Sequence, residues 1–323
     1  MKKEALKKRL SAYSKDILLP ENFHDKLALA VMAYADLLFD NFTIENNEGR
    51  MDVKTQYGNA IGTFWAARCV REVFRTQRFS RGLYSSILKK IGQGKKPVHV
   101  LYAGTGPFAT LALPIMMMLK PEEVQFTCLE INPESIDKLK QVIEFFGLGA
   151  YIKSIKQCVA AFWEVDNKTI DIVISETMNR ALITEPQVAI MLNLASQLST
   201  DVIFLPEKIK VSVSKMNRKE RTPESIKELI NFNRSFMQTI IQNSVNREWV
   251  FPQQNVQVTI SEEEQLYYLT EIKVNDENTL HFNESSLNLL EKIKTHKKHG
   301  SLNLNFKYSV VGKPGFIVAE INT

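Results

Sequence analysis

Five short apolar runs in the middle of the chain alternate with stretches of helical pattern, and this alternation constrains the fold more than any other feature. The runs are VHVLYA, VQFTCLE, YIKSIKQ, IDIVIS and DVIFL, which lie between Val98 and Leu205. Strands that alternate with helices are typical of βαβ units, which build a parallel sheet with helices on both faces. The sequence therefore predicts an α/β core over residues 96–206.

The two flanking parts of the chain follow different patterns. Residues 1–95 place apolar residues three or four positions apart, as in ENFHDKLALAVMAYADLLFD, which is typical of helices. Residues 207–323 contain alternating runs such as KIKVSVSKM and LYYLTEIKV, interrupted by one helical piece near ESIKELINFNRSFMQTIIQNS. Alternation without crossover helices indicates a largely antiparallel sheet or barrel. We therefore expect an N-terminal helical segment or lid (1–95), the α/β core (96–206) and a β-rich, barrel-like domain for substrate binding or dimerisation (207–323).

Composition narrows the class of protein. With 323 residues and 44% hydrophobic content, the chain can fill a real core. No apolar run reaches the length of about 18 residues that a membrane-spanning helix requires, and MKKEALKKRL does not lead into an apolar signal region. We expect a cytoplasmic protein that does not bind membranes.

The charges and cysteines give weaker signals. Basic patches at 215–221 and 292–300 lie within a net charge of only +5, and no aromatic residues interleave with them, so we do not expect a nucleic-acid partner. Cys69, Cys128 and Cys158 are widely separated, with no CxxC or Cys/His cluster, so we expect no metal and no disulfide framework. The three cysteines are expected to be reduced core residues.

A glycine turn follows the first strand of the α/β core. In LYAGTGPFATLALP, Gly104, Gly106 and Ala109 satisfy the GxGxxG/A pattern between a strand and an expected helix, whose N-terminus offers unpaired N–H groups to a ligand. The next strand ends in Glu130, which is suited to accept hydrogen bonds from a ribose diol; the alternative is a surface carboxylate that opens the next helix. No GK[ST] follows the glycines, so the turn lacks the phosphate-binding features of a P-loop. The parallel α/β pattern after the turn is long enough for only one mononucleotide-binding half, whereas a dinucleotide site is built from two. The pattern predicts a nucleoside cofactor and favours S-adenosylmethionine over a dinucleotide.

The order of LYAGTGPFA, CLEIN and DIVISETMNRALITEP resembles the class I S-adenosylmethionine-dependent methyltransferases, most closely the protein arginine methyltransferases. In that family the fourth strand is followed by a double-glutamate loop, SExMGxxLxxxE, and REVFRT resembles its DxxRT segment, whose arginine grips the cofactor's carboxylate. The resemblance implies a Rossmann-like fold and S-adenosylmethionine as cofactor, with S-adenosylhomocysteine as product. It assigns catalysis to Glu176 and Glu185, and cofactor binding to Arg75, Tyr102, Gly104, Gly106, Glu130 and Cys158. Within the loop, we expect Met178 and Arg180 to bind the substrate.

The chain departs from the family in several places. Tyr102 stands where the family has an aspartate, so one polar contact to the cofactor must be replaced or lost. Asn179 and Arg180 occupy the turn where the family has a glycine and a variable residue. No Thr-His-Trp segment is present; the nearest similarity, at 295–297, lies close to the C-terminus. Cys158 stands where such folds contact adenine, although core packing also explains it.

Two carboxylates at the end of a buried strand suit one chemistry in particular. A guanidinium is planar, carries five N–H donors and stays protonated, so it is a poor nucleophile until its charge is drawn away from one nitrogen. Charge-assisted hydrogen bonds to Glu176 and Glu185 would orient its plane and leave electron density on the nitrogen that faces the methyl donor. The leading hypothesis is therefore methyl transfer to a guanidino or amino nitrogen, with no metal.

The substrate and the assembly are left more open. The missing Thr-His-Trp segment and turn glycine favour a small molecule such as free arginine, whose carboxylate Arg180 could bind, over a protein arginine. Tyr102 also allows transfer of the aminocarboxypropyl group or an intramolecular cyclisation, and a non-catalytic cofactor- or RNA-binding protein on the same fold is a further alternative. A homodimer is conceivable, with an arm in the helical segment at 223–244.

Overall fold

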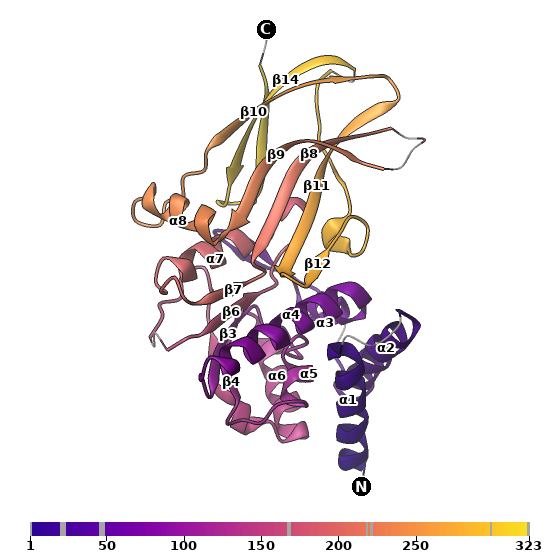
Figure 1. Ribbon diagram of the computed structural model, residues 1–323, viewed down its shortest axis with the longest axis vertical. Coiled ribbons are helices and arrows are strands. Elements are labelled where there is room, and N and C mark those ends of the chain that lie inside the picture. Colours follow the sequence, from indigo (N-terminus) through magenta and orange to yellow (C-terminus); the bar gives the residue numbers. More distant parts are fainter. Residues whose placement is uncertain are drawn as a thin grey trace.

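The computed structural model describes residues 2–19, 24–44, 49–166, 169–217, 219, 222–297 and 299–321. At its centre lies a five-stranded sheet in the order β5-β4-β3-β6-β7 (Figure 1). Each neighbouring pair of strands is parallel, which confirms the predicted α/β core. The strands are β3 (Val98–Ala103), β4 (Val124–Glu130), β5 (Ile152–Gln157), β6 (Ile172–Ser175) and β7 (Ile203–Leu205).

The central strands are continuous apolar runs because helices cover both faces of the sheet. Every residue of β3 and β6 is buried. Helix α4 (Val73–Gly92) packs on β3, β6 and β7, while α6 (Pro133–Phe146) packs on β4 and β5. Because β4 and β6 flank β3 on opposite sides, a crevice is expected where these strands end.

The first 95 residues are mainly helical, as predicted. Helices α1 (Lys2–Leu18) and α2 (His24–Asn41) pack against each other, and α3 (Thr63–Arg68) and the 3-10 turn η1 (Cys69–Arg71) lead into α4. The hairpin of β1 (Val53–Thr55) and β2 (Gly58–Ala60) was not predicted, because three residues per strand leave no visible alternation. Its position depends on contacts with distant residues: Asn59 N–H donates to Thr184 O, and Gly312 N–H donates to Gln56 O.

The C-terminal part consists of two antiparallel sheets, as the alternating pattern predicted. One contains β12 (Asn278–Leu280), β11 (Glu264–Asn275), β8 (Lys208–Asn217) and β9 (Glu224–Asn233), with β13 (Glu291–Lys292) paired to β11. The other contains β10 (Gln253–Ile260), β14 (Gly300–Ser309) and β15 (Gly315–Glu320). Rings from both sheets meet between them, as where Tyr268 lies edge-on to Phe306 with centroids 6.2 Å apart.

The expected helix over 223–244 is only partly present. Residues Glu224–Asn233 form strand β9, paired antiparallel to β8, and only Arg234–Gln242 form a helix, α8. Strand pairing overrides the helical pattern here because β8 offers an open edge that only a strand can satisfy. Helix α8 packs on α7 (Gln187–Ala195) and lies at the edge of the molecule (Figure 1), and a role of this segment as a dimerisation arm stays a prediction.

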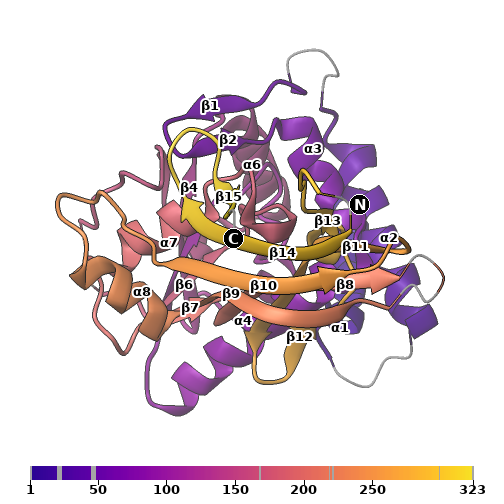
Figure 2. The same cartoon turned by 90° about the horizontal axis from the view of Figure 1, so that it is seen from above.

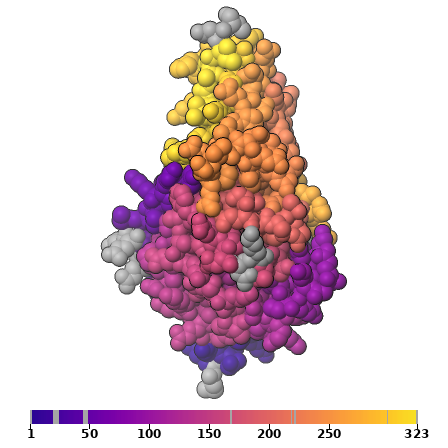
Figure 3. Space-filling view, turned by 90° about the vertical axis from the view of Figure 1, so that its left-hand side faces the viewer, coloured from indigo at the N-terminus to yellow at the C-terminus, as the bar shows by residue number. Residues whose placement is uncertain are grey.

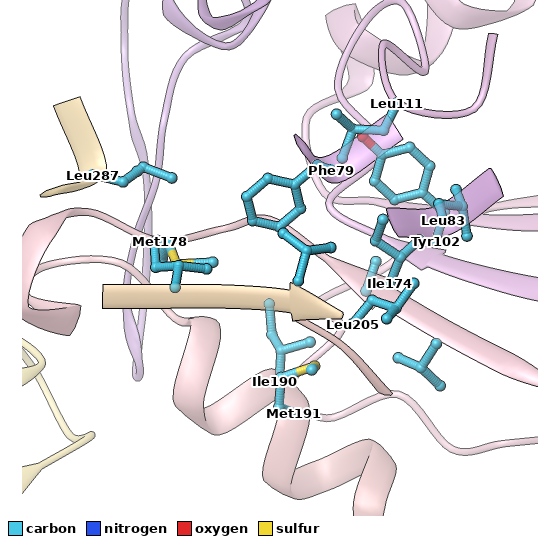
Figure 4. Close-up of a cluster of buried hydrophobic side chains, with 14 of the residues drawn as sticks. Phe79, Leu83, Tyr102, Leu111, Ile174, Met178, Ile190, Met191, Leu205 and Leu287 are labelled. Carbon is cyan, nitrogen blue, oxygen red and sulfur yellow. The ribbon is translucent and has the colours of Figure 1, made fainter. Parts of the chain in front are cut away.

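The three parts meet around α4. Viewed from above, the curved strands of the β-rich part lie over the α/β core (Figure 2), and the space-filling view shows a narrower β-rich half on a broader α/β half (Figure 3). A buried apolar cluster links them: Phe79 of α4, Tyr102 of β3 and Ile174 of β6 are shown with Leu287 of the C-terminal part in Figure 4. The domain boundaries at 95 and 206 stay a prediction.

The structure describes the two basic patches, at 215–221 and 292–300, only in part. The residues of these patches that lie outside the described ranges are Arg218, Glu220, Arg221 and Lys298. Within the residues that the structure covers, no helix has the length and apolar character needed to cross a membrane.

Candidate functional site

A cavity of about 1030 Å³ opens where β3, β4 and β6 end. It lies in the crevice expected of such a sheet, with the neighbours of β3 on either side. The residues assigned to catalysis and cofactor binding from the sequence all line it: Arg75, Tyr102, Gly104, Gly106, Glu130, Cys158, Glu176 and Glu185. The structure thus brings together residues that are spread over more than a hundred positions of the chain.

The glycine turn forms one wall of this cavity. Gly104 and Gly106 have φ angles of +73° and +66°, in the left-handed region where glycine is favoured. A Cβ on Gly104 would lie 2.1 Å from Cγ2 of Thr177, so this glycine lets the turn pack against the loop after β6. A Cβ on Gly106 would meet only Ala66, at 4.0 Å. Gly104 is therefore needed for packing, while Gly106 leaves space open beside the cavity.

The long helix expected after the glycines is absent. The chain runs through irregular turns, with Ala109 at φ +46°, before the four-residue helix α5 (Leu113–Met116). Pro107 and Pro114 each lack an N–H and cannot donate a helical hydrogen bond, which disfavours a regular helix across this segment. The backbone N–H groups of a helix N-terminus are thus not what this turn offers a ligand.

Glu130 is fixed at the end of β4 by three backbone N–H groups. Gly106 N–H donates to Oε2 at 2.7 Å, and those of Ile131 and Asn132 donate to Oε1 at 2.9 Å. Burial raises the pKa of Glu130, although these hydrogen bonds oppose the rise. A carboxylate has about four lone-pair sites, so one remains for a ligand hydroxyl. The carboxylate is therefore tied to the glycine turn and still faces the cavity.

Tyr102 lies in the cavity wall but points its hydroxyl into the protein. Figure 4 shows the phenol oxygen directed towards Leu111, whose backbone hydrogen-bonds with it. Burial raises the pKa of this phenol well above its usual value, so it stays neutral. Tyr102 thus supplies an apolar ring where an aspartate would have supplied a carboxylate.

Arg75 joins the two acidic groups at the centre of the site. Its Nε donates to Oε2 of Glu176 at 3.0 Å, its Nη2 donates to the same oxygen, and its Nη1 donates to Glu72 at 2.8 Å. Glu72 also accepts from Ser285 Oγ and from both the N–H and Oγ of Ser286. The described structure therefore shows Arg75 bonded to protein carboxylates; its expected contact with a cofactor carboxylate stays a prediction.

The two glutamates of the loop after β6 have raised pKa values. Burial raises the pKa of Glu176 to about 7, against the opposing effect of Arg75, and Oε1 of its carboxylate is buried with no hydrogen-bond partner among the described residues. Burial, and next the charge of Glu176, raise the pKa of Glu185 to about 8. No side-chain hydrogen bond to Glu185 is found in the described part of the chain. Arg75 thus pairs with Glu176 and only partly offsets the rise in the pKa of Glu185, which has no ion-pair partner of its own among the described residues.

The loop that carries these glutamates is held in an uncommon backbone conformation. Ala181, Leu182 and Thr184 have φ angles of +54°, +55° and +67°, although none of them is glycine. Gln187 secures the loop, because its Oε1 accepts from Thr177 N–H at 2.9 Å and its Nε2 donates to Ser175 O at 3.1 Å. Strained backbone of this kind persists only where surrounding contacts hold it and is frequent at functional sites.

A second cavity, of about 640 Å³, adjoins the first. The two share Ile61, Cys69, Arg75 and Glu185 in their walls. The second cavity is also lined by Trp65, Arg68, Glu72, Met178, Asn179, Ser286 and Leu287. A cofactor in one cavity and a second reactant in the other would therefore meet beside Glu185.

The two residues assigned to substrate binding are placed differently. Met178 is buried and lines the second cavity. Arg180 lines neither cavity, because its Nε donates to Glu291 of β13 at 2.8 Å. The structure therefore gives no support to a substrate contact by Arg180.

The cysteines are only partly core residues. Cys128 is fully buried, whereas Cys69 and Cys158 are half-buried and line the first cavity. Burial raises the pKa of both cavity thiols to about 11, so they remain protonated near neutral pH. No group of three His, Cys, Asp or Glu side chains that could hold a metal is found within the described ranges.

Sequence reasoning missed several residues of the site. Glu72, Ser285 and Ser286 complete the network around Arg75, and Trp65 and Arg68 line the second cavity. Only Glu72 had a visible signal, because an acid three positions before Arg75 lies on the same face of a helix. The serines come from the C-terminal part, and no local pattern places them here.

Comparisons with known proteins support the fold. No protein-family model matches the sequence, and no curated protein matches it either. Among solved structures, protein arginine methyltransferase 10 from Arabidopsis thaliana, described in a uniquely open conformation, matches with a TM-score of 0.50 and 11% identity, over 77% of this chain and 95% of that chain. A chain of the Trypanosoma brucei PRMT1 enzyme-prozyme heterotetrameric complex with AdoHcy matches with a TM-score of 0.47 and 15% identity, over 75% of this chain and 86% of that chain. The chain thus shares the fold of a protein arginine methyltransferase.

Proposed function

We propose that the protein is an S-adenosylmethionine-dependent methyltransferase that acts on a guanidino or amino nitrogen, such as that of free arginine. The observation that carries the proposal is the unpartnered oxygen of Glu176, a residue that lines the first cavity together with Glu185, which also lines the second. Two buried carboxylates whose pKa values stay raised despite the neighbouring Arg75 are suited to receive a further cation.

The first cavity suits a nucleoside cofactor. It lies at the carboxyl ends of parallel strands, where sheets of this kind bind their ligands. Glu130 keeps a lone pair for a ribose hydroxyl, and Gly106 lets a ligand approach the backbone. Bound S-adenosylmethionine would supply an electrophilic methyl group on a positively charged sulfur.

The residues of the chain would bind and orient the acceptor. Glu176 Oε1 and Glu185 accept hydrogen bonds from the acceptor's guanidinium and fix its plane. Arg75 donates two hydrogen bonds to the other oxygen of Glu176, Oε2, and thereby fixes the orientation of the carboxylate and of its unpartnered oxygen. Positioning of the acceptor nitrogen, which the two carboxylates provide, is a major source of rate acceleration in displacements of this kind.

The experiment is a calorimetric titration with S-adenosylmethionine and S-adenosylhomocysteine, followed by product analysis with arginine as acceptor. Methyl transfer yields S-adenosylhomocysteine and a methylated acceptor. Methylthioadenosine would instead indicate aminocarboxypropyl transfer or cyclisation, and binding without turnover of any acceptor would favour a non-catalytic protein. No cofactor binding at all would refute the proposal.

A further inference from the structure

The charged groups that line the second cavity are paired, with two exceptions. Four charged side chains line it: Arg68, Glu72, Arg75 and Glu185. Arg75 and Glu72 form an ion pair at 2.8 Å, and Glu72 is further held by two serines. This leaves Glu185 at the wall shared with the first cavity and Arg68 elsewhere in the lining. The cavity therefore presents one carboxyl group, that of Glu185, and one guanidinium, that of Arg68, without an ion-pair partner among the described residues.

Arg68 is available for a ligand. It ends helix α3, is exposed, and forms no ion pair with any residue that the structure describes. Its guanidinium lies over the ring of Phe64, with Cζ 5.5 Å from the ring centroid, which supports the group without using its charge. An arginine presents a planar fork of donors that matches a carboxylate.

The other arginines near the second cavity are either engaged or outside its lining. Arg180 is bonded to Glu291, Arg71 to Asp36, and Arg75 to Glu72 and Glu176. Arg50 lies over the rings of Phe64 and Trp65 but does not line the cavity. A carboxylate brought into the second cavity would thus find its partner in Arg68. The neighbouring Trp65, Met178 and Leu287 offer apolar surface for an alkyl chain between the two charged ends.

We propose that the acceptor is a small guanidino acid that carries its own free carboxylate, and that Arg68 binds this carboxylate while the guanidinium lies between Glu185 and Glu176. This inference rests on the proposed function and narrows its substrate class. It replaces Arg180 by Arg68 as the residue that recognises the carboxylate.

The test compares L-arginine with agmatine, which has the same guanidino group and chain but no carboxylate. Values of kcat/KM for both acceptors are measured with the wild-type protein, Arg68→Ala, Arg68→Lys and Arg71→Ala. Arg71 is the matched control, because it is a partly exposed arginine three positions away that lines neither cavity. Thermal unfolding and S-adenosylmethionine affinity are measured on each variant to show that it folds.

The expected result is that the wild-type protein prefers arginine by about tenfold or more, as one charge-assisted pair allows. Arg68→Ala should reduce this ratio towards one, mainly through KM for arginine, Arg68→Lys should retain part of it, and Arg71→Ala should retain all of it. Equal use of both acceptors, a ratio unchanged in Arg68→Ala, or methylation only of arginine within peptides would overturn the inference while leaving guanidino methylation intact. Methylation of neither a guanidino nor an amino compound would remove the proposed function as well.

Discussion

Arg75 donates from both Nε and Nη2 to one oxygen of Glu176, Oε2, and leaves Oε1 of the same carboxylate buried without a partner among the described residues. Because Arg75 anchors one oxygen of this carboxylate, the orientation of the other oxygen is fixed. We expect this oxygen and Glu185 to accept hydrogen bonds from the substrate's guanidinium.

Glu176→Gln should abolish most turnover and spare cofactor binding. The amide has no charge and only one acceptor atom, so it cannot serve both Arg75 and a guanidinium. We expect kcat to fall about 100-fold or more, as for loss of a charged group that acts on the reacting atoms. Single-turnover kinetics and calorimetry check this, and an unchanged kcat would exclude the double-glutamate mechanism.

Glu185→Gln should stabilise the protein at alkaline pH while reducing turnover. Because the pKa of Glu185 is raised in the folded state to about 8, the folded state binds more protons than the unfolded state between about pH 4.5 and 8, and stability falls as pH rises through this window. The substitution removes this loss and should raise the free energy of unfolding at pH 9, by up to about 1.4 kcal/mol for each unit by which folding raises the pKa. Urea unfolding at pH 5 and pH 9 tests it; the gain should be much smaller at pH 5.

The rate should increase with pH. Both glutamates must be ionised to accept from a guanidinium, which keeps its charge, and their pKa values are raised to about 7 and about 8. We expect kcat/KM to rise through this range and level off above it. A pH–rate profile that is flat or descends between about pH 6 and 9 would contradict these roles.

Glu72→Gln should reduce turnover, although Glu72 itself does not contact the reacting atoms and acts through Arg75. It removes one of the two carboxylates that hold Arg75 and one of the negative charges that raise the pKa of Glu176. We expect kcat to fall about tenfold, and the lower of the two pKa values in the pH–rate profile to decrease. Ser286→Ala should have the same effects to a smaller extent, because Ser285 still donates a hydrogen bond to Glu72. A fall in stability with no change in the profile would make Glu72 a purely structural residue.

Gly106→Ala should weaken cofactor binding more than it destabilises the fold. Gly147→Ala is a matched control, since Gly147 has φ +67° against +66° for Gly106 and neither would meet a close contact. Both changes should cost about 1 kcal/mol of stability through backbone strain. Only Gly106 lines the cavity, so only its change should raise the Kd for S-adenosylmethionine. Equal affinities in the two variants would place the cofactor elsewhere.

The sequence predicted the parts of this molecule that local pattern controls. The apolar runs identify β3 and β6 because strands buried on both faces must be apolar, and the loop after β6 brings both glutamates of the motif, Glu176 and Glu185, to the wall of the first cavity. The pattern failed at 224–233, where pairing with β8 decides the conformation, and after Gly106, where prolines prevent the expected long helix.

The remaining parts of the site depend on contacts between distant segments. Ser285 and Ser286 reach Glu72 across more than two hundred residues, and Arg180, a residue expected to bind substrate, pairs with Glu291 of β13. No periodicity in one sequence records such contacts, because they depend on how the β-rich part packs on α4.

Mass spectrometry of the reaction of purified protein with S-adenosylmethionine and L-arginine, beside the Glu176→Gln variant, would show directly whether the two glutamates promote methyl transfer to a guanidino nitrogen. We expect S-adenosylhomocysteine and N-methylated arginine in equal amounts from the wild-type protein, and neither above background from the variant. Methylthioadenosine as the product, or equal yields from the two proteins, would contradict this expectation.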